Sequence, residues 1–285
     1  MKVILVPVAD RPECARALKT AFDLGQRLDA SIIGCHIRDH SYSKVSMPAD
    51  LGLLGGIDAE WEKAWKKKKT ASSHTKALAL FGKVAEKSDY ELIKRARAKR
   101  GALWTEKVGS PGRILTIHGP VSDLLVVSRP AKKDSKLAGI FMNAALLHST
   151  RPVLILPQTG NISIGKRIAI AWNQSSEAAR AVAAALPLLD QADEVNIVTF
   201  GPENALGPKS SHLANYLAHR GIKAKRVRTR GKGDAQAILK SYRDARSDLL
   251  VMGAYSRSRF RERIFGGVTD HMLHKANIPV LMLHS

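Results

Sequence analysis

The sequence is poor in cysteine and has no long apolar run. Its 285 residues include two cysteines, Cys14 and Cys35, which are too few for a disulfide framework or a four-cysteine zinc site. We expect both to be small buried side chains in a reducing compartment. No apolar stretch approaches the roughly 18 residues of a transmembrane helix, and the N-terminal run reaches Asp10 too early for a signal peptide. The sequence therefore predicts a cytoplasmic protein without a membrane-spanning segment.

Acidic residues are scarce relative to basic ones. The chain carries 46 Lys and Arg against 25 Asp and Glu, a formal net charge of +21, and both halves share the excess. Such a charge attracts polyanions at low salt, although a solvated basic surface is the simpler explanation. With 45% hydrophobic residues the chain can bury a substantial core, so we expect a folded protein of about two domains.

Apolar runs alternate with helical stretches twice along the chain. Alanine-rich amphipathic segments at 12–28 and 175–189 follow the first run of each half. The predicted strands are 2–8, 31–37, 103–108, 123–128 and 152–156 in the first half, and 166–172, 194–200, 224–229, 248–253 and 279–283 in the second. Strands that alternate with helices predict parallel sheets joined by right-handed crossovers. We therefore expect an α/β protein of two tandem domains, 1–157 and 162–285.

The first half carries extra residues near 39–102. Trp61 and Trp65 lie at i and i+4 of a predicted helix there, and four lysines, 66–69, follow. The pair is typical of a helix face packed on its domain, with the lysines in solvent. A nucleic-acid or partner surface is the alternative, because aromatic side chains beside lysines also bind single strands.

The last part of the chain has the pattern of an anion site. An apolar run ends at Gly253, a polar loop follows, and the pair Gly266-Gly267 opens a predicted helix. Such a junction presents backbone N–H groups and the positive end of a helix dipole to an anion. The first half repeats this pattern with most of the glycines replaced, which indicates a duplicated unit.

These segments resemble the tandem universal stress protein (UspA-like) family. The resemblance is carried by 247–255, the helix opening Gly266-Gly267-Val268, the ending 278–281 and the segment 168–182. It covers nearly the whole chain, more strongly in 166–285 than in 1–157. It implies a Rossmann-like, five-stranded parallel sheet in each domain and packing of the two domains as a pseudo-dimer. It also implies a stress-response protein that binds nucleotide.

ATP-binding members of the family carry a glycine, two residues, a second glycine, nine residues, and a glycine followed by serine or threonine. Here Gly253 and Gly266 match the first and third glycines, Ser256 replaces the second, and Gly267 replaces the hydroxyl residue. The missing hydroxyl costs about 0.5–1.5 kcal/mol, roughly three- to tenfold in affinity. Arginines in the loop can offset this loss by charge-assisted bonds to phosphate. They are Arg257, Arg259, Arg261 and Arg263.

The resemblance also implies where adenosine would bind. Asn173 takes the place of an acid at the end of the first strand of the second domain, and Thr199 lies where the adenine edge would meet the backbone. The implied ligand is ATP or AMP, with Mg²⁺ accompanying ATP. The implied site consists of Ala171, Asn173, Thr199, Gly253, Ser256, Arg257, Gly266, Gly267 and Val268. In the first domain Ser128 and Ala131 replace the glycines, so we expect no tight nucleotide site there.

No other constellation predicts chemistry. His271 and His274 lie at i and i+3 of a predicted helix but lack a third metal ligand. No serine or cysteine carries the local signature of a catalytic nucleophile. Asp234 and Ser110 precede helical stretches, and we expect both to cap them.

We therefore expect a non-enzymatic sensor or adaptor whose second domain binds an adenine nucleotide, with at most slow, incidental ATP hydrolysis. The alternative is a nucleotide-free interaction module that binds a protein or a polyanion through its basic surface, which Ser256 and Gly267 favour. A hydrolase or ligase on the related adenine-nucleotide architecture is least favoured. Nucleic acid is not the favoured partner, no membrane partner is expected, and homodimerisation beyond the internal pair stays open.

Overall fold

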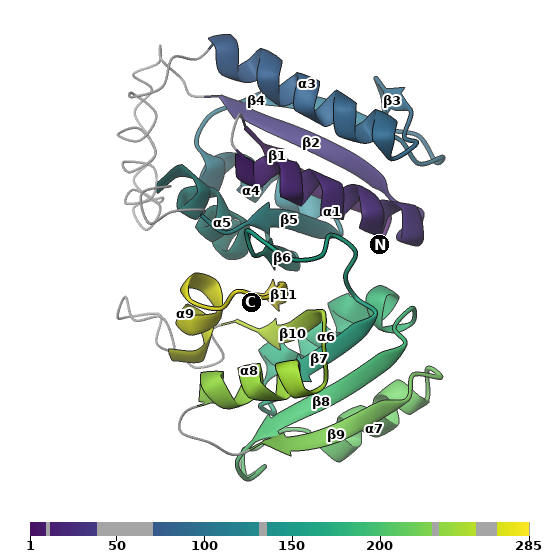
Figure 1. The fold of residues 1–285 in the computed structure, drawn as a ribbon, viewed down its shortest axis with the longest axis vertical. Coiled ribbons are helices and arrows are strands. Elements are labelled where there is room, and N and C mark those ends of the chain that lie inside the picture. The colour runs from purple at the N-terminus through teal and green to yellow at the C-terminus, as the bar shows by residue number, and fades with distance from the viewer. Residues whose placement is uncertain (10–11, 39–70, 131–135, 230–233, 255–266, 285) are drawn as a thin grey trace. The chain divides into compact units, whose positions relative to one another are not determined.

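The structure is a computed structural model that describes residues 1–9, 12–38, 71–130, 136–229, 234–254 and 267–284 (Figure 1). The chain divides into two compact units, Met1–Gln158 and Thr159–Ser285. Trp61, Trp65 and the lysines 66–69 lie outside the described residues. Each unit is an α/β structure with a parallel sheet flanked by helices, which confirms the predicted fold class.

The first unit has the strand order β3-β4-β2-β1-β5-β6. Its strands are β1 (Val3–Val8), β2 (Ser31–Arg38), β3 (Leu92–Ile93), β4 (Ala102–Val108), β5 (Leu124–Ser128) and β6 (Val153–Leu156). Its helices are α1 (Pro12–Leu28), α3 (Ala71–Lys87), α4 (Pro111–His118) and α5 (Lys136–His148), with a 3₁₀ turn at Gly119–Val121.

The second unit has the strand order β11-β10-β7-β8-β9. Its strands are β7 (Arg167–Ala171), β8 (Glu194–Phe200), β9 (Ala224–Thr229), β10 (Leu249–Gly253) and β11 (Val280–Leu283). Its helices are α6 (Ser176–Leu189), α7 (Ser210–Ala218), α8 (Asp234–Asp244) and α9 (Gly267–His274). The described strands of both units run parallel and are mostly buried, as the continuous apolar runs of the sequence predict.

The strand registers show the duplication directly. Ile4 pairs with Leu124 in the first unit, and Ile168 pairs with Leu249 in the second. An aspartate one residue before each of these partners holds the start of the neighbouring strand. Asp123 accepts hydrogen bonds from the backbone N–H groups of Lys2 and Val3, and Asp248 accepts them from Gly165, Lys166 and Arg167.

The first unit departs from the expected five strands by the short strand β3. Leu92 and Ile93 pair in parallel with Ala102 and Leu103 of β4. Gly101 permits this pairing, because a Cβ at that position would lie 2.8 Å from the Ile93 side chain. The sequence hides β3 because two residues are too few to establish an alternating pattern.

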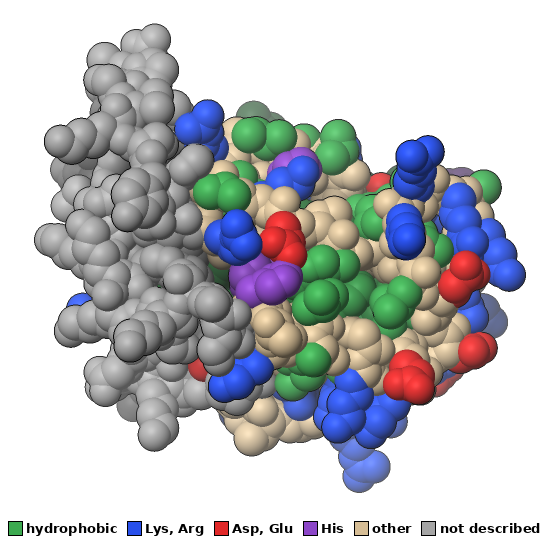
Figure 2. Space-filling model, turned by 90° about the horizontal axis from the view of Figure 1, so that it is seen from above, with side chains coloured by type: hydrophobic (Ala, Val, Ile, Leu, Met, Phe, Trp, Pro, Cys, Tyr) green, Lys and Arg blue, Asp and Glu red, His purple; other side chains and the backbone are tan. Residues whose placement is uncertain are grey.

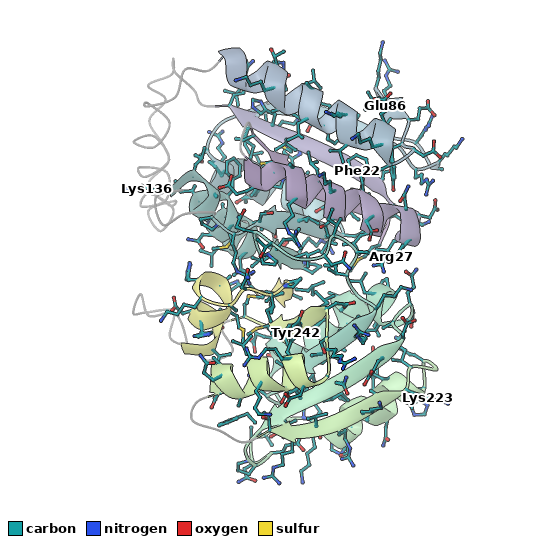
Figure 3. All side chains as sticks on the ribbon, in the orientation of Figure 1. Phe22, Arg27, Glu86, Lys136, Lys223 and Tyr242 are labelled. Atoms are coloured by element: carbon teal, nitrogen blue, oxygen red, sulfur yellow. The ribbon has the colours of Figure 1, made fainter. Side chains whose placement is uncertain are left out.

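Aromatic side chains fill the core between α1, α3 and the sheet of the first unit. Phe22, labelled in Figure 3, lies 5.7 Å from Phe81 and 4.9 Å from Tyr90 between ring centroids. The Phe81 ring packs directly on Gly34 of β2, where a Cβ would lie only 2.7 Å from the ring. In the second unit, Tyr242 of α8 is buried (Figure 3), and burial raises the pKa of its hydroxyl.

The capping predictions have mixed outcomes. The Ser110 side chain accepts a hydrogen bond from the Arg113 backbone nitrogen, so Ser110 caps α4 as predicted. Asp234 is instead the first residue of α8, where its charge favours the helix dipole from inside the first turn. Cys14 and Cys35 are buried, as predicted. None of the helices within the described ranges is long and apolar enough to cross a membrane.

Candidate functional site

The predicted site lies where β7, β8 and β10 end and α6 and α9 begin. Parallel strands bring their carboxyl ends to one edge of the sheet, where open α/β sheets bind ligands. Ser256, Arg257 and Gly266 lie outside the described residues. The structure describes the six other predicted residues, which are Ala171, Asn173, Thr199, Gly253, Gly267 and Val268.

Gly253 closes the end of β10 against the first turn of α6. An ideal Cβ on Gly253 would lie 2.5 Å from the Ala178 backbone nitrogen and 2.6 Å from the Glu177 carbonyl carbon. Both atoms belong to a helix backbone that cannot move aside cheaply. Glycine is therefore required here for packing, whether or not a ligand approaches.

Asn173 belongs to the turn that starts α6. Its side-chain oxygen accepts a hydrogen bond from the Ser175 nitrogen at 3.3 Å, and Ser175 caps the helix by accepting from the Ala178 nitrogen at 3.1 Å. These bonds connect the predicted adenosine residue to the same helix turn that packs on Gly253. Asn173 itself is exposed, so its amide nitrogen lies at the surface of this edge.

Ala171 and Thr199 contribute little side-chain surface. They are 8% and 5% exposed, at the ends of β7 and β8. The two strands stay paired beyond Ala171, because the Trp172 nitrogen donates to the Val198 carbonyl oxygen at 2.8 Å. Any contact from these two positions to a ligand would come from the backbone.

A segment that we name the strap, residues 201–209, folds from the end of β8 onto the β7–α6 turn. The Trp172 indole nitrogen donates to the Pro208 carbonyl oxygen at 2.8 Å. The Gln174 amide donates to the carbonyl oxygens of Ala205 and Gly207, at 3.1 and 3.0 Å, and accepts from the Ala205 nitrogen at 3.2 Å. The strap is thus fastened to the turn that carries Asn173.

Gln174 and Trp172 are the residues that sequence reasoning missed. Gln174 is buried and has a left-handed backbone with φ 64°, an uncommon conformation for a residue with a side chain. The strap passes close to the Gln174 backbone at Gly207. Only glycine fits there, because a Cβ would collide with the Gln174 carbonyl oxygen. Pro202, Gly207 and Pro208 in the strap are the sequence signal that could have indicated a shaped turn here.

The start of α9 is open, in contrast to the start of α6. Gly267 is its first residue and is exposed, and a Cβ built on it meets no atom of the described residues within 4 Å. Val268 is half-buried and Thr269 is buried, so the helix rests on the sheet while its first residue does not. Among the described residues, no packing contact of the kind found at Gly253 explains a glycine at this position.

The universal stress protein family model matches residues 202–284, from the strap to the last strand. That part of the second unit therefore resembles a universal stress protein domain. The chain is also similar to a solved universal stress protein from Archaeoglobus fulgidus DSM 4304, with a TM-score of 0.68 and 17% identity over 99% of this chain and 98% of that one. A functionally unknown protein from Pseudomonas aeruginosa PAO1 is similar with a TM-score of 0.53 and 13% identity, over 100% and 92%.

These likenesses extend the universal stress protein fold over both units, and the predicted resemblance to the UspA-like family is confirmed. At such identities the solved structures establish the fold alone. No curated protein matches this sequence. The pseudo-dimeric packing and the degenerate character of the first domain stay predictions.

The first unit has a different carboxyl edge. The strand registers place Ser128 where the second unit has Gly253. Beside Ser128, at the first turn of α1, Glu13 and Cys14 line a cavity of about 10 Å³. Phe141 of α5 lines it from another side. A space of this size is at the lower limit for one water, so side chains fill the place where a phosphate would approach.

Two polar groups at this edge are buried. The Ser128 hydroxyl has no hydrogen-bond partner among the described residues. Arg129 is 6% exposed, and burial lowers the pKa of its guanidinium to about 10. The Arg129 carbonyl oxygen accepts a hydrogen bond from the Gln158 side chain. These buried side chains favour a structural role for this edge.

The described histidines do not form a metal site. His271 and His274 both lie on α9, and His274 is 3.8 Å from the Asp270 carboxylate. Within the described ranges no group of three His, Cys, Asp or Glu side chains is placed to hold a metal ion. His271 and His274 are therefore helix-surface residues in the part of the chain that the structure describes.

Proposed function

We propose that this tandem universal stress protein binds an adenine nucleotide, ATP or AMP, at the carboxyl edge of its second unit. It would act there as a cytoplasmic, non-catalytic sensor or adaptor in a stress response. Binding would change how the segment between β10 and α9 is presented to a protein partner.

The observation that carries this proposal is the open first turn of α9. Gly267 is exposed, and a Cβ on it would meet none of the described residues within 4 Å, at the edge of the sheet where ligands bind in this class of fold. A helix start offers unpaired backbone N–H groups and a positive partial charge, which suit a phosphate. The neighbouring exposed amide of Asn173 is a hydrogen-bonding group for ribose or base.

The proposed roles follow from these positions. The backbone of Gly266, Gly267 and Val268 would bind phosphate, with Ser256 and Arg257 adding a hydroxyl and a charge. Asn173 and the backbone at Ala171 and Thr199 would contact adenosine, and Mg²⁺ would accompany ATP. Gly253 has an indirect role, since it lets α6 approach the end of β10.

We propose no catalytic role. At the described part of this edge Asn173, Gln174 and Ser175 are engaged in turns and caps. The two carboxylates there are also engaged, Glu177 with Arg180 and Glu203 with the Ser210 hydroxyl. None of these groups suits a general base near neutral pH. ATP turnover faster than about 1 per second would contradict this part of the proposal.

The test uses two substitutions at one position that has room for a side chain. Gly267→Asp places a carboxylate in the first turn of α9, where it suits the helix but repels phosphate. Gly267→Ser adds the hydroxyl that ATP-binding relatives carry. Titration calorimetry of purified, nucleotide-free protein with MgATP and with AMP would measure both variants beside the wild type.

We expect measurable binding to the wild type, roughly three- to tenfold tighter binding to Gly267→Ser, and none to Gly267→Asp. Equal unfolding temperatures of the three proteins without ligand would show that the fold is intact. Binding that is unchanged in Gly267→Asp would place the nucleotide elsewhere. No binding to wild type or Gly267→Ser would contradict the proposal.

A nucleotide-free interaction module is the second candidate function. The strap favours it, because it is fastened to the turn beside Asn173 by two hydrogen bonds that Gln174 donates, one that Gln174 accepts from Ala205, and one that Trp172 donates. In that case the second unit would show no thermal shift with adenosine compounds. Its binding to polyanions would weaken steeply with salt.

A further inference from the structure

The connection between β3 and β4, residues 94–100, is a dense cluster of positive charge that we name the basic loop. Five of its seven residues are cations, and the other two are Ala96 and Ala98. The cations are Lys94, Arg95, Arg97, Lys99 and Arg100. All are exposed except Arg100, which is half-buried. Figure 2 views the molecule from above the orientation of Figure 1. Lys and Arg side chains gather there at the right-hand end, opposite the grey residues.

Two of the five cations hold the basic loop in place. Arg97 forms a bidentate ion pair with Glu91, one residue before β3. The Arg100 guanidinium lies 5.1 Å from the centroid of the Tyr90 ring. Tyr90 is itself fixed, because it is buried and its hydroxyl donates to the Ala30 carbonyl oxygen at 2.8 Å. The loop is therefore held at its middle by the ion pair with Glu91 and at its C-terminal end by the contact with the buried Tyr90.

The other three cations are available to a ligand. Lys94, Arg95 and Lys99 form no ion pair within 4.0 Å with any described residue. Three exposed cations on an anchored loop repel one another in the free protein, and an anion that binds them relieves this repulsion. Self-repulsion of this kind contributes nothing to folding, so the charge is better explained by a ligand.

The second unit has a similar arrangement before β9, which pairs with β8 as β4 pairs with β2. Arg220 lies 5.2 Å from the centroid of the Tyr216 ring, as Arg100 does from Tyr90. Four exposed cations lie just before β9 and along it. They are Lys223 (labelled in Figure 3), Lys225, Arg226 and Arg228. Lys225 is paired with Glu194 at 3.1 Å, and the Arg228 side chain donates to the Gly201 carbonyl oxygen at 3.0 Å. An arginine stacked on a tyrosine beside a basic edge is thus a feature of both units.

We propose that the basic loop binds the phosphodiester backbone of nucleic acid without reading its sequence. Closely spaced exposed cations match a polymer that carries one charge per nucleotide. Alanines are the loop's other residues, so it has no aromatic side chain to stack on a base and no carboxylate or amide to read a base edge. The inference concerns a different unit and a different ligand class from the nucleotide site, and it does not depend on that site.

The same chemistry disfavours two other anionic partners. A lipid surface needs apolar side chains beside the charges, and next to the basic loop Leu92, 58% exposed, is the one large apolar side chain that the structure describes as exposed. The basic loop has five cations in seven residues. An acidic protein surface seldom presents a continuous row of anions that matches such a density of positive charge. The experiment below distinguishes binding to a lipid surface and binding to an acidic protein from binding to nucleic acid.

The test removes the three available cations and keeps the two that anchor the loop. The loop variant combines Lys94→Gln, Arg95→Gln and Lys99→Gln. The control variant combines Lys19→Gln, Lys83→Gln and Lys275→Gln, three exposed lysines from other elements, so that both variants have the same net charge. Fluorescence anisotropy would measure the binding of each full-length protein to a labelled mixed-sequence DNA oligonucleotide between about 50 and 200 mM salt.

We expect the wild type to bind with a steep loss of affinity as salt rises. The loop variant should bind at least about tenfold more weakly, and its slope of log K against log salt should be smaller by about 2 to 3. The control variant should stay close to the wild type. Unchanged thermal unfolding of both variants would confirm that the substitutions act on the surface.

Three results would overturn the proposal. Equal weakening of both variants would show that only the net charge matters. Absence of DNA binding to the wild type even at the lowest salt would exclude nucleic acid. Tighter, loop-dependent binding to phosphatidylserine vesicles or to polyglutamate than to DNA would assign the basic loop to a membrane or to an acidic protein instead.

Discussion

Gly253 at the end of β10 lies so close to Ala178 in the first turn of α6 that a Cβ on Gly253 would be 2.5 Å from the Ala178 backbone nitrogen. This contact brings the β10 end and the α6 start together at the edge of the second sheet. The glycine that begins the nucleotide motif is thus explained by packing alone. Gly267 has no such explanation and is the more informative residue for ligand binding.

Gly253→Ala should destabilise the second unit. The added methyl group would force the β10 end away from α6, and overpacking of this kind costs about 1–3 kcal/mol. Gly267→Ala is the matched control, because a Cβ there meets none of the described residues within 4 Å and alanine favours the helix. Urea unfolding should show a lower midpoint for Gly253→Ala and an unchanged or slightly higher one for Gly267→Ala. Equal midpoints would contradict the packing role of Gly253.

Ser128→Ala should leave the first unit as stable or make it slightly more stable. The Ser128 hydroxyl is buried and has no hydrogen-bond partner among the described residues. A buried hydroxyl without a partner carries a desolvation penalty of about 1–3 kcal/mol, and replacing it by a methyl hydrogen removes this penalty without breaking a hydrogen bond. The free energy of unfolding of wild type and variant would be compared by urea titration. A loss of more than about 1 kcal/mol would show that the hydroxyl makes a bond through ordered water.

Most strands were predictable because they are buried on both faces, whereas β4 and β9 are largely half-buried or exposed. The predicted run 194–200 matches β8 residue for residue, and 31–37 differs from β2 only by Arg38. Continuous apolar runs bounded by polar turns leave few alternatives in a parallel sheet. The strand β3 escaped prediction because its two residues are held by pairing with β4 and not by a pattern of their own.

The site was predictable only in part, for a physical reason. Gly253, Asn173 and Gly267 stand at strand ends and helix starts, which local patterns locate. The strap is held by contacts between Gln174 and residues about 30 positions later, and such tertiary bonds leave no periodic signal. The Arg100–Tyr90 contact and its counterpart in the second unit likewise depend on how the loops fold back.

Gln174→Ala should release the strap. The substitution leaves the Ala205 nitrogen and the carbonyl oxygens of Ala205 and Gly207 without their present partner. Loss of such bonds typically costs about 1–3 kcal/mol locally. Hydrogen exchange followed by mass spectrometry should show faster exchange in 203–209, while peptides of the first unit stay unchanged. Protection of the strap equal to the wild type would mean that Trp172 and the strap's own turns suffice to hold it.

The pH dependence of folding should carry a contribution from His36 of β2. This side chain is 1% exposed, and neither ring nitrogen has a hydrogen-bond partner among the described residues. Burial above all, and then the nearby His74, lowers the pKa of His36, with Arg38 acting in the same direction and Glu106 opposing it. The His36 ring lies 5.5 Å from His74 and is stacked on Trp104 at 5.8 Å between centroids.

The sign follows from the lowered pKa. The unfolded chain takes up a proton on His36 at a higher pH than the folded chain does, so the free energy of unfolding should fall as pH decreases below about 6.5. His36→Phe keeps a ring on Trp104 but cannot be protonated. Urea unfolding between about pH 7.5 and pH 5 should therefore give a smaller loss of stability for the variant than for the wild type. Parallel pH profiles would show that His36 keeps the same protonation in both states, and that acid acts on the first unit through other groups.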